Sequence, residues 1–158
     1  MSKNRPFPPP GGEGAESPLG ETMDNTPCFE ATTDDVRVVV QTFWLDDQSE
    51  PDEHRYVWAY RIRIENHGTE QIQLLRRSWR IVDGKGRIDR VEGDGVVGEQ
   101  PLIDAAASFE YMSGAALETP TGFMGGMYHM IRPASRQHFD VSIPVFSLDS
   151  PHHPTVLH

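Results

Sequence analysis

The residues from Tyr56 to Ile64 alternate between two kinds of side chain, and this pattern constrains the fold more than any other. One phase holds Tyr56, Trp58, Tyr60, Ile62 and Ile64, and the other holds Val57, Ala59, Arg61 and Arg63. A period of two residues is typical of a β-strand with one face on an apolar core. We therefore predict a half-buried strand whose inner side is aromatic and aliphatic.

Weaker versions of the pattern recur along the chain, at about residues 36–40, 72–82, 87–91, 109–111, 124–130 and 139–145. Turn signals separate them, among them Asn66-His67-Gly68, Asp83-Gly84-Lys85-Gly86 and Thr119-Pro120-Thr121-Gly122. About seven short strands without a convincing helix predict an all-β fold. We expect an antiparallel β-sandwich of the fibronectin type III or immunoglobulin style.

For two of these segments, the pattern also predicts which side chains face the core. In 72–82, Leu75, Trp79 and Ile81 are expected to face the core, with Arg77 in the same phase. Arg77 is therefore expected either at the rim or half-buried beside an aromatic ring, where it would need an anionic or carbonyl partner. In 139–145 the apolar phase is expected to run to Val145, and Pro144 indicates a sheet edge or a bulge.

The first 32 residues differ from the rest in composition. They are rich in Pro, Gly, Ser, Thr and Glu, with Pro8-Pro9-Pro10-Gly11-Gly12 as the clearest stretch. Such a segment buries too little apolar surface to offset its ordering entropy. We expect disorder over residues 1–32 and a single folded domain over residues 33–158.

The charge and the apolar content exclude several classes of function. The formal net charge is -10 and the isoelectric point about 5.0, which argues against duplex DNA or an anionic membrane as a partner. No apolar stretch approaches the roughly 20 residues that span a bilayer, and we expect no signal peptide. The single cysteine, Cys28, fits a reducing compartment. We expect a soluble, cytoplasmic protein.

Gly93, Gly95 and Gly98 form the pattern Gly-x-Gly-x-x-Gly, which in dinucleotide-binding folds opens a helix. Pro101 follows closely and no helical pattern starts there, so we expect a loop between strands. Such a loop can turn backbone N–H groups toward an anion without a helix. Alternatively, the loop binds nothing, and its glycines are needed only because the backbone adopts positive φ angles that other residues avoid.

The segment before this loop is basic. Between Arg55 and Arg90 lie nine basic and four acidic residues, a balance of +5. If the neighbouring strands pair, Arg61 and Arg63 with Arg76 and Arg80 would form a basic strip; otherwise they form a solubilising face. Arginine suits phosphate because its planar fork makes two charge-assisted bonds. The predicted ligand site for a phosphate-bearing molecule comprises Gly93, Gly95, Gly98, Arg77, Arg87 and Arg90.

The sequence bears on two other classes of function. A protein-interaction module would use edge strands and loops, with 114–126, including Phe123 and Met124, as a candidate contact. Catalysis is not expected, because no His-Glu-x-x-His or Gly-x-Ser-x-Gly motif occurs. The separate histidines His54, His67, His129 and His138 leave a composite site open. No metal site is expected, and the tail histidines His152, His153 and His158 lack an anchor.

Several motifs resemble the ApaG family. They are the run from Val91 to Ile103, Ser113-Gly114, Glu118-Thr119-Pro120-Thr121-Gly122, Tyr128-His129-Met130-Ile131, Ile143-Pro144-Val145-Phe146 and Pro154-Thr155-Val156-Leu157-His158. The resemblance spans about residues 34–158 and implies a fibronectin type III-like sandwich.

The resemblance also implies a bacterial protein associated with magnesium and cobalt homeostasis, often described as involved in cobalt/magnesium efflux. In the family the glycine motif has been proposed to bind pyrophosphate or nucleotide phosphates. Similar eukaryotic domains act as protein-interaction modules. A binding module is therefore expected rather than an enzyme. Without a spanning segment, any effect on metal transport would be indirect.

Overall fold

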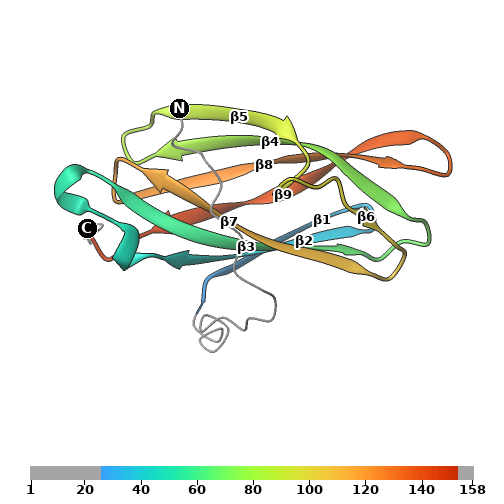
Figure 1. Ribbon diagram of the computed structural model, residues 1–158, viewed down its shortest axis with the longest axis horizontal. Coiled ribbons are helices and arrows are strands. Elements are labelled where there is room, and N and C mark those ends of the chain that lie inside the picture. The colour runs from blue at the N-terminus through green and yellow to red at the C-terminus, as the bar shows by residue number, and fades with distance from the viewer. Residues whose placement is uncertain (1–25, 153–158) are drawn as a thin grey trace.

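A computed structural model describes residues 26–152, which fold into two antiparallel sheets packed face to face (Figure 1). The first sheet has the order β1-β2-β3-β7, with β1 Cys28–Thr33, β2 Val36–Trp44, β3 Tyr56–Asn66 and β7 Ser108–Leu117. The second has the order β5-β4-β8-β9, with β5 Ile88–Asp94, β4 Ile72–Asp83, β8 Thr121–Arg132 and β9 Gln137–Asp149. The short β6 (Leu102–Ile103) also pairs with β4, and two short 3₁₀ turns, η3 (Asp46–Gln48) and η4 (Pro51–Glu53), precede β3. The predicted all-β sandwich is confirmed.

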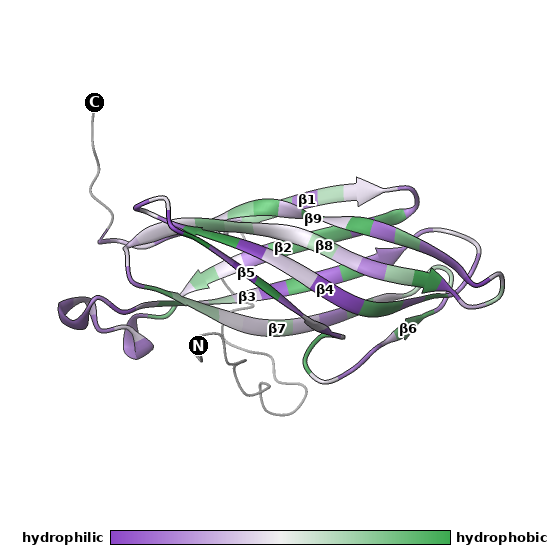
Figure 2. Cartoon of the chain, turned by 90° about the horizontal axis from the view of Figure 1, so that it is seen from above, coloured by the Kyte–Doolittle hydropathy of each residue, from purple (hydrophilic) through white to green (hydrophobic). Residues whose placement is uncertain are grey.

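The predicted inner face of β3 is the centre of the core. Tyr56, Trp58, Tyr60, Ile62 and Ile64 are all buried. The rings of Tyr60, Trp79 and Phe146 meet between the sheets, with centroids 5.6 to 5.9 Å apart. Such tilted and edge-on aromatic pairs stabilise a core beyond the area they bury. Apolar and polar residues alternate along the strands, as Figure 2 shows.

The predicted disorder is wrong for residues 28–32, because they belong to β1. Phe29 packs on Phe146 with ring centroids 6.1 Å apart, and the Ser142 N–H donates to Thr33 Oγ1 at 3.0 Å. These contacts join β1 to β9 and close one side of the sandwich. Residues 1–25 and the tail histidines His153 and His158 lie outside the described residues.

A β-bulge in β4 changes which side chains face the core. Leu74 pairs with Met130 and Arg76 with His129, so Leu75 is an extra residue on its strand. An extra residue reverses the facing of every side chain that follows. Leu74 is therefore buried rather than Leu75, which corrects the predicted phase. Arg77, Trp79 and Ile81 face inward as predicted.

A second bulge lies between β8 and β9. Met124 pairs with Phe146 and Gly126 with Ile143, which leaves Pro144 and Val145 at the irregularity. Pro144 predicted a sheet edge or a bulge, and both are found, since β9 is also an edge strand. The predicted facing of Val145 is wrong: its exposed fraction is 66%, because the bulge moves Phe146 into the core instead.

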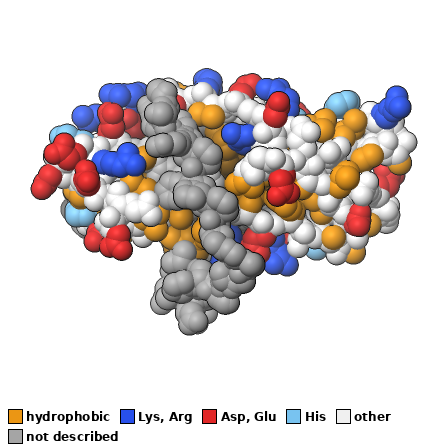
Figure 3. Space-filling model, in the orientation of Figure 1, with side chains coloured by type: hydrophobic (Ala, Val, Ile, Leu, Met, Phe, Trp, Pro, Cys, Tyr) orange, Lys and Arg blue, Asp and Glu red, His pale blue; other side chains and the backbone are white. Residues whose placement is uncertain are grey.

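The predicted basic strip does not form, because β3 and β4 belong to different sheets. Arg61 contacts Gln41 and Glu110, Arg63 contacts Glu65, and Arg76 contacts Glu92. Figure 3 shows basic and acidic side chains interspersed over the visible face. Within residues 26–152, no helix has the length and apolar character needed to cross a bilayer.

The adjacent glycines Gly125 and Gly126 differ in the space around them. A Cβ on Gly126 would lie 1.9 Å from the Ser78 carbonyl oxygen, whereas one on Gly125 would meet only the Val145 side chain at 3.0 Å. We predict that Gly126→Ala lowers the free energy of unfolding by about 3 kcal/mol or more, since backbone must move. Gly125→Ala, the matched control, should change it by less than about 1 kcal/mol. Urea unfolding measures both, and equal effects would contradict the packing described here.

Candidate functional site

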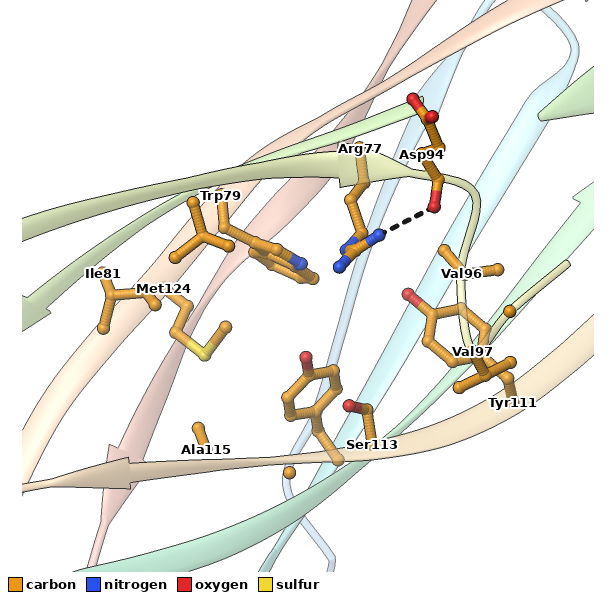
Figure 4. A pocket seen from close by; sticks show the side chains of 14 residues that line it. Arg77, Trp79, Ile81, Asp94, Val96, Val97, Tyr111, Ser113, Ala115 and Met124 are labelled. Carbon is orange, nitrogen blue, oxygen red and sulfur yellow. Dashed lines mark hydrogen bonds between the residues drawn. The ribbon is translucent and has the colours of Figure 1, made fainter. Parts of the chain in front are cut away.

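A cavity of about 230 Å³ lies between the two sheets, at the edge strands β5 and β7 (Figure 4). β4 supplies Arg77, Trp79 and Ile81, and β7 supplies Tyr111, Ser113, Gly114 and Ala115. The remaining lining residues are Tyr60, Val91, Asp94, Val96, Val97, Gly98 and Met124. The cavity thus has mainly apolar and aromatic walls with a few polar groups, as small-molecule sites have.

Arg77 is the cation of this cavity. Its Nη1 donates to the backbone oxygens of Asp94, at 3.0 Å, and Gly95, at 2.8 Å. The predicted carbonyl partner of an inward arginine is confirmed. Its guanidinium lies against Gly93, where a Cβ would come within 2.9 Å of Nη1. Within residues 26–152, Nη2 and Nε have no hydrogen-bond partner, so a fixed cation keeps donors for a ligand.

Hydroxyl groups gather on the opposite wall, where Ser113 bonds to Tyr60. Tyr111, from the same wall, shares a hydrogen bond of 2.7 Å between hydroxyl oxygens with Tyr128, which is paired with Arg77 in the other sheet. Burial raises the pKa of Tyr60, and the Ser113 hydrogen bond and the Arg77 charge offset part of this rise. Burial also raises the pKa of Tyr111 and of Tyr128. These hydroxyls therefore remain protonated and neutral well above neutral pH.

The glycine loop closes on itself and opens no helix. The Gly95 N–H donates to the Leu75 oxygen at 2.8 Å, and Val96 and Glu99 exchange both backbone hydrogen bonds at 2.8 Å. Val97 and Gly98 have φ of 41° and 82°, as in a two-residue type I′ turn. Within the described residues, the backbone N–H groups of Val97 and Gly98 are the ones in this turn that have no hydrogen-bond acceptor. The loop is therefore a tight turn whose carbonyls hold Arg77.

The structure brings together four of the six predicted site residues: Arg77, Gly93, Gly95 and Gly98. Arg87 lies apart, at the turn between β4 and β5, near Asp83 at 3.9 Å and Glu118 at 3.6 Å. Arg90 pairs with Arg80 on the outer face of the sheet. Neither arginine lines the cavity, because strand direction and register place these side chains elsewhere.

Sequence reasoning missed the hydroxyl wall. The sequence predicts Tyr60 only as a core residue, Tyr111 only as part of a strand, and Ser113 only as part of a family motif. The candidate interaction loop 114–126 is mostly strand: Met124 is buried in the cavity wall, and Phe123 is 41% exposed on the outer face. Within residues 26–152 no cluster of three or more His, Cys, Asp or Glu side chains could hold a metal ion.

Comparison with known proteins gives consistent matches. The family model of the ApaG domain matches residues 46–132. The Protein ApaG of Rhodospirillum centenum is 51% identical over 124 residues, covering 78% of this chain and 95% of the relative. That of Parvibaculum lavamentivorans is 48% identical over 130 residues, covering 82% and 99%. The crystal structure of the putative ApaA protein from Bordetella pertussis superimposes with a TM-score of 0.71 at 39% identity, covering 78% of this chain and 98% of that one.

The buried tyrosines predict a loss of stability at alkaline pH. Their raised pKa values keep them protonated in the folded protein, whereas they ionise near pH 10 once unfolded. Their contribution is thus present below about pH 10 and is lost as the pH rises toward the folded pKa, by about 1.4 kcal/mol per pH unit for each tyrosine.

Urea unfolding between about pH 9 and pH 11 measures this slope. Tyr60→Phe should reduce the slope of the unfolding free energy against pH by the contribution of one tyrosine, because one titrating group is removed from the unfolded state. Phenolate absorbance from all three tyrosines near pH 10 in the folded protein would contradict the burial described here.

Proposed function

The chain belongs to the ApaG family, and on the geometry of its cavity we propose that it is a binding module for a small phosphate-bearing molecule. Pyrophosphate and nucleotides are the ligand class. The observation that carries the proposal is Arg77, a cation fixed by two carbonyl oxygens at a cavity, with Nη2 and Nε unused within residues 26–152. Arginine held in this way binds phosphate without reorganising.

The loop supplies a second set of donors. Val97 and Gly98 line the cavity, and the N–H groups of their turn have no partner in the described residues. A phosphate between Arg77 and this turn would receive charge-assisted bonds from one side and backbone bonds from the other. Two of the three motif glycines thus act indirectly: Gly93 makes room for the guanidinium and Gly95 allows the close turn.

The cavity volume limits what lies beyond the phosphate. Drug-sized ligands occupy sites of about 300–1,000 Å³, so a cavity of about 230 Å³ admits one ring or a short chain. Trp79 and Met124 offer apolar walls, and the hydroxyls of Ser113 and Tyr60 offer hydrogen bonds. We propose that a nucleotide would place its phosphate at Arg77 and its ring between the sheets.

A phosphate site in this cavity would explain how the magnesium and cobalt association implied by the family could arise. A divalent cation would reach this site as a phosphate complex, without a carboxylate cluster of the chain. Binding alone would then link the protein to metal homeostasis, with no catalytic step. Adding magnesium to a titration with ATP tests whether the complex or the free nucleotide binds.

A protein-interaction module is the alternative, and one observation favours it. β7 is an edge strand with a single charged residue, Glu110, whereas the edge strand β5 carries Asp89, Arg90, Glu92 and Asp94. Charges on an edge discourage pairing with another chain. Of these two edges, the nearly uncharged β7 is thus better suited to accept a partner strand.

Substitution of Arg77 tests the proposed function. Arg77→Met should weaken pyrophosphate binding by about 10- to 100-fold, because a hydrogen bond to a charged group contributes about 1.5–3 kcal/mol. Arg77→Lys should retain part of the affinity through its charge. Titration calorimetry at constant ionic strength measures both. Arg87→Gln and Arg90→Gln are matched controls, and an equal loss in them would show diffuse electrostatic attraction rather than a site.

A substitution that fills part of the cavity tests the proposed ring position separately from the phosphate position. Ala115 is buried in the wall of β7, so Ala115→Leu should occupy the space proposed for the ring and leave Arg77 in place. We predict at least tenfold weaker nucleotide binding with unchanged pyrophosphate binding. If the variant keeps the wild-type melting temperature and nucleotide affinity, the ring does not enter the cavity.

A further inference from the structure

Three side chains on the outer face of the second sheet are hydrogen-bonded in series. The Ser78 Oγ lies 2.8 Å from His129 Nε2, and His129 Nδ1 lies 2.8 Å from Asp140 Oδ1. They come from β4, β8 and β9, where Arg76 pairs with His129 and His129 with Asp140. They lie on the opposite side of the sheet from Arg77, so they are distinct from the cavity.

When Asp140 is ionised and His129 is neutral, the chemistry of the three groups fixes the direction of both bonds. An ionised carboxylate only accepts, so Asp140 holds the proton on His129 Nδ1. In the neutral ring Nε2 is then an acceptor, and the Ser78 hydroxyl donates to it. A hydroxyl bonded to a base, which is itself oriented by a third group, is the arrangement of an activated nucleophile.

The surroundings of Ser78 supply a cation. Arg80 is two residues further along the same face of β4, about 7 Å away along the strand, and opposite Arg90 on β5. Neither arginine has an ion pair or side-chain hydrogen bond with any residue between 26 and 152. Arg80 is therefore free to stabilise negative charge that develops on a carbonyl oxygen above Ser78.

The same face also carries apolar side chains. Met127 pairs with Ser78 directly and is 38% exposed, while Phe123 and Val145 are 41% and 66% exposed. Outer faces of sandwich sheets are normally polar, so a group of exposed apolar residues marks a contact surface. An acyl chain laid over Met127 would bring its carbonyl carbon beside Ser78.

We propose that Ser78, His129 and Asp140 form a second site that hydrolyses esters of short apolar acyl groups. Ser78 Oγ attacks the carbonyl carbon while His129 Nε2 takes its proton, and Arg80 faces the oxyanion. The ester C–O bond then breaks, and the leaving alcohol takes the proton from His129. Water, deprotonated by His129, releases the acid and restores Ser78. Asp140 is a positioning residue that acts through His129.

The test uses the full chain and p-nitrophenyl butyrate. We expect a p-nitrophenolate burst stoichiometric with protein, and a butyryl group on the peptide that contains Ser78. Ser78→Ala should abolish the burst, and His129→Gln should lower the rate at least about 100-fold, the lower end of the range for general acid–base catalysis. Asp140→Asn should lower kcat with KM unchanged, a split that loss of packing alone would not produce.

Ser142→Ala is the matched control, because Ser142 pairs with Met127 on the same face and is not bonded to His129. It should keep full activity, and melting temperatures show whether each variant is folded. Hydrolysis that persists in Ser78→Ala would identify simple imidazole catalysis and overturn the proposal. An absent burst, or butyryl groups only on lysine or histidine, would overturn it equally.

Discussion

The extra residue Leu75 in β4 determines where the candidate site forms. Without that bulge, Arg77 and Trp79 would face the solvent and Ser78 the core, because facing alternates along a strand. The bulge also exposes the Leu75 carbonyl, which accepts from the Gly95 N–H at 2.8 Å and from Gln100 Nε2 at 2.9 Å. One inserted residue thus turns the cation inward and anchors the loop that holds it.

The loop and the arginine depend on each other. Gly93 leaves space for the guanidinium, and the carbonyls of Asp94 and Gly95 accept from it. Val97 and Gly98 both have positive φ, and this backbone conformation makes the turn tight. The tight turn keeps the carbonyls of Asp94 and Gly95 in place. A half-buried charge is stabilised by such partners, because desolvation without them is costly. A local anion site is therefore compatible with a chain of net charge -10.

The sequence predicted the parts of the fold that follow from alternation alone. Alternate residues of β3, from Tyr56 to Ile64, face inward as expected, because no bulge interrupts this strand. Leu74 and Leu75 are identical in character, so no residue type marks which one is extra. β1 was missed because its sequence, half exposed throughout, shows no strong apolar alternation. The cavity wall of Tyr60, Tyr111 and Ser113 joins strands far apart in sequence, which requires knowledge of strand pairing.

We propose that Arg77 and its turn form a specific phosphate site in the cavity. Backbone amide NMR shifts during a pyrophosphate titration at constant ionic strength distinguish such a site from diffuse attraction. Saturable shifts are expected, confined to residues 93–99, Arg77 and the facing residues of β7. Shifts spread over every exposed arginine and lost in moderate salt would contradict the proposal, because they would report charge attraction without a site.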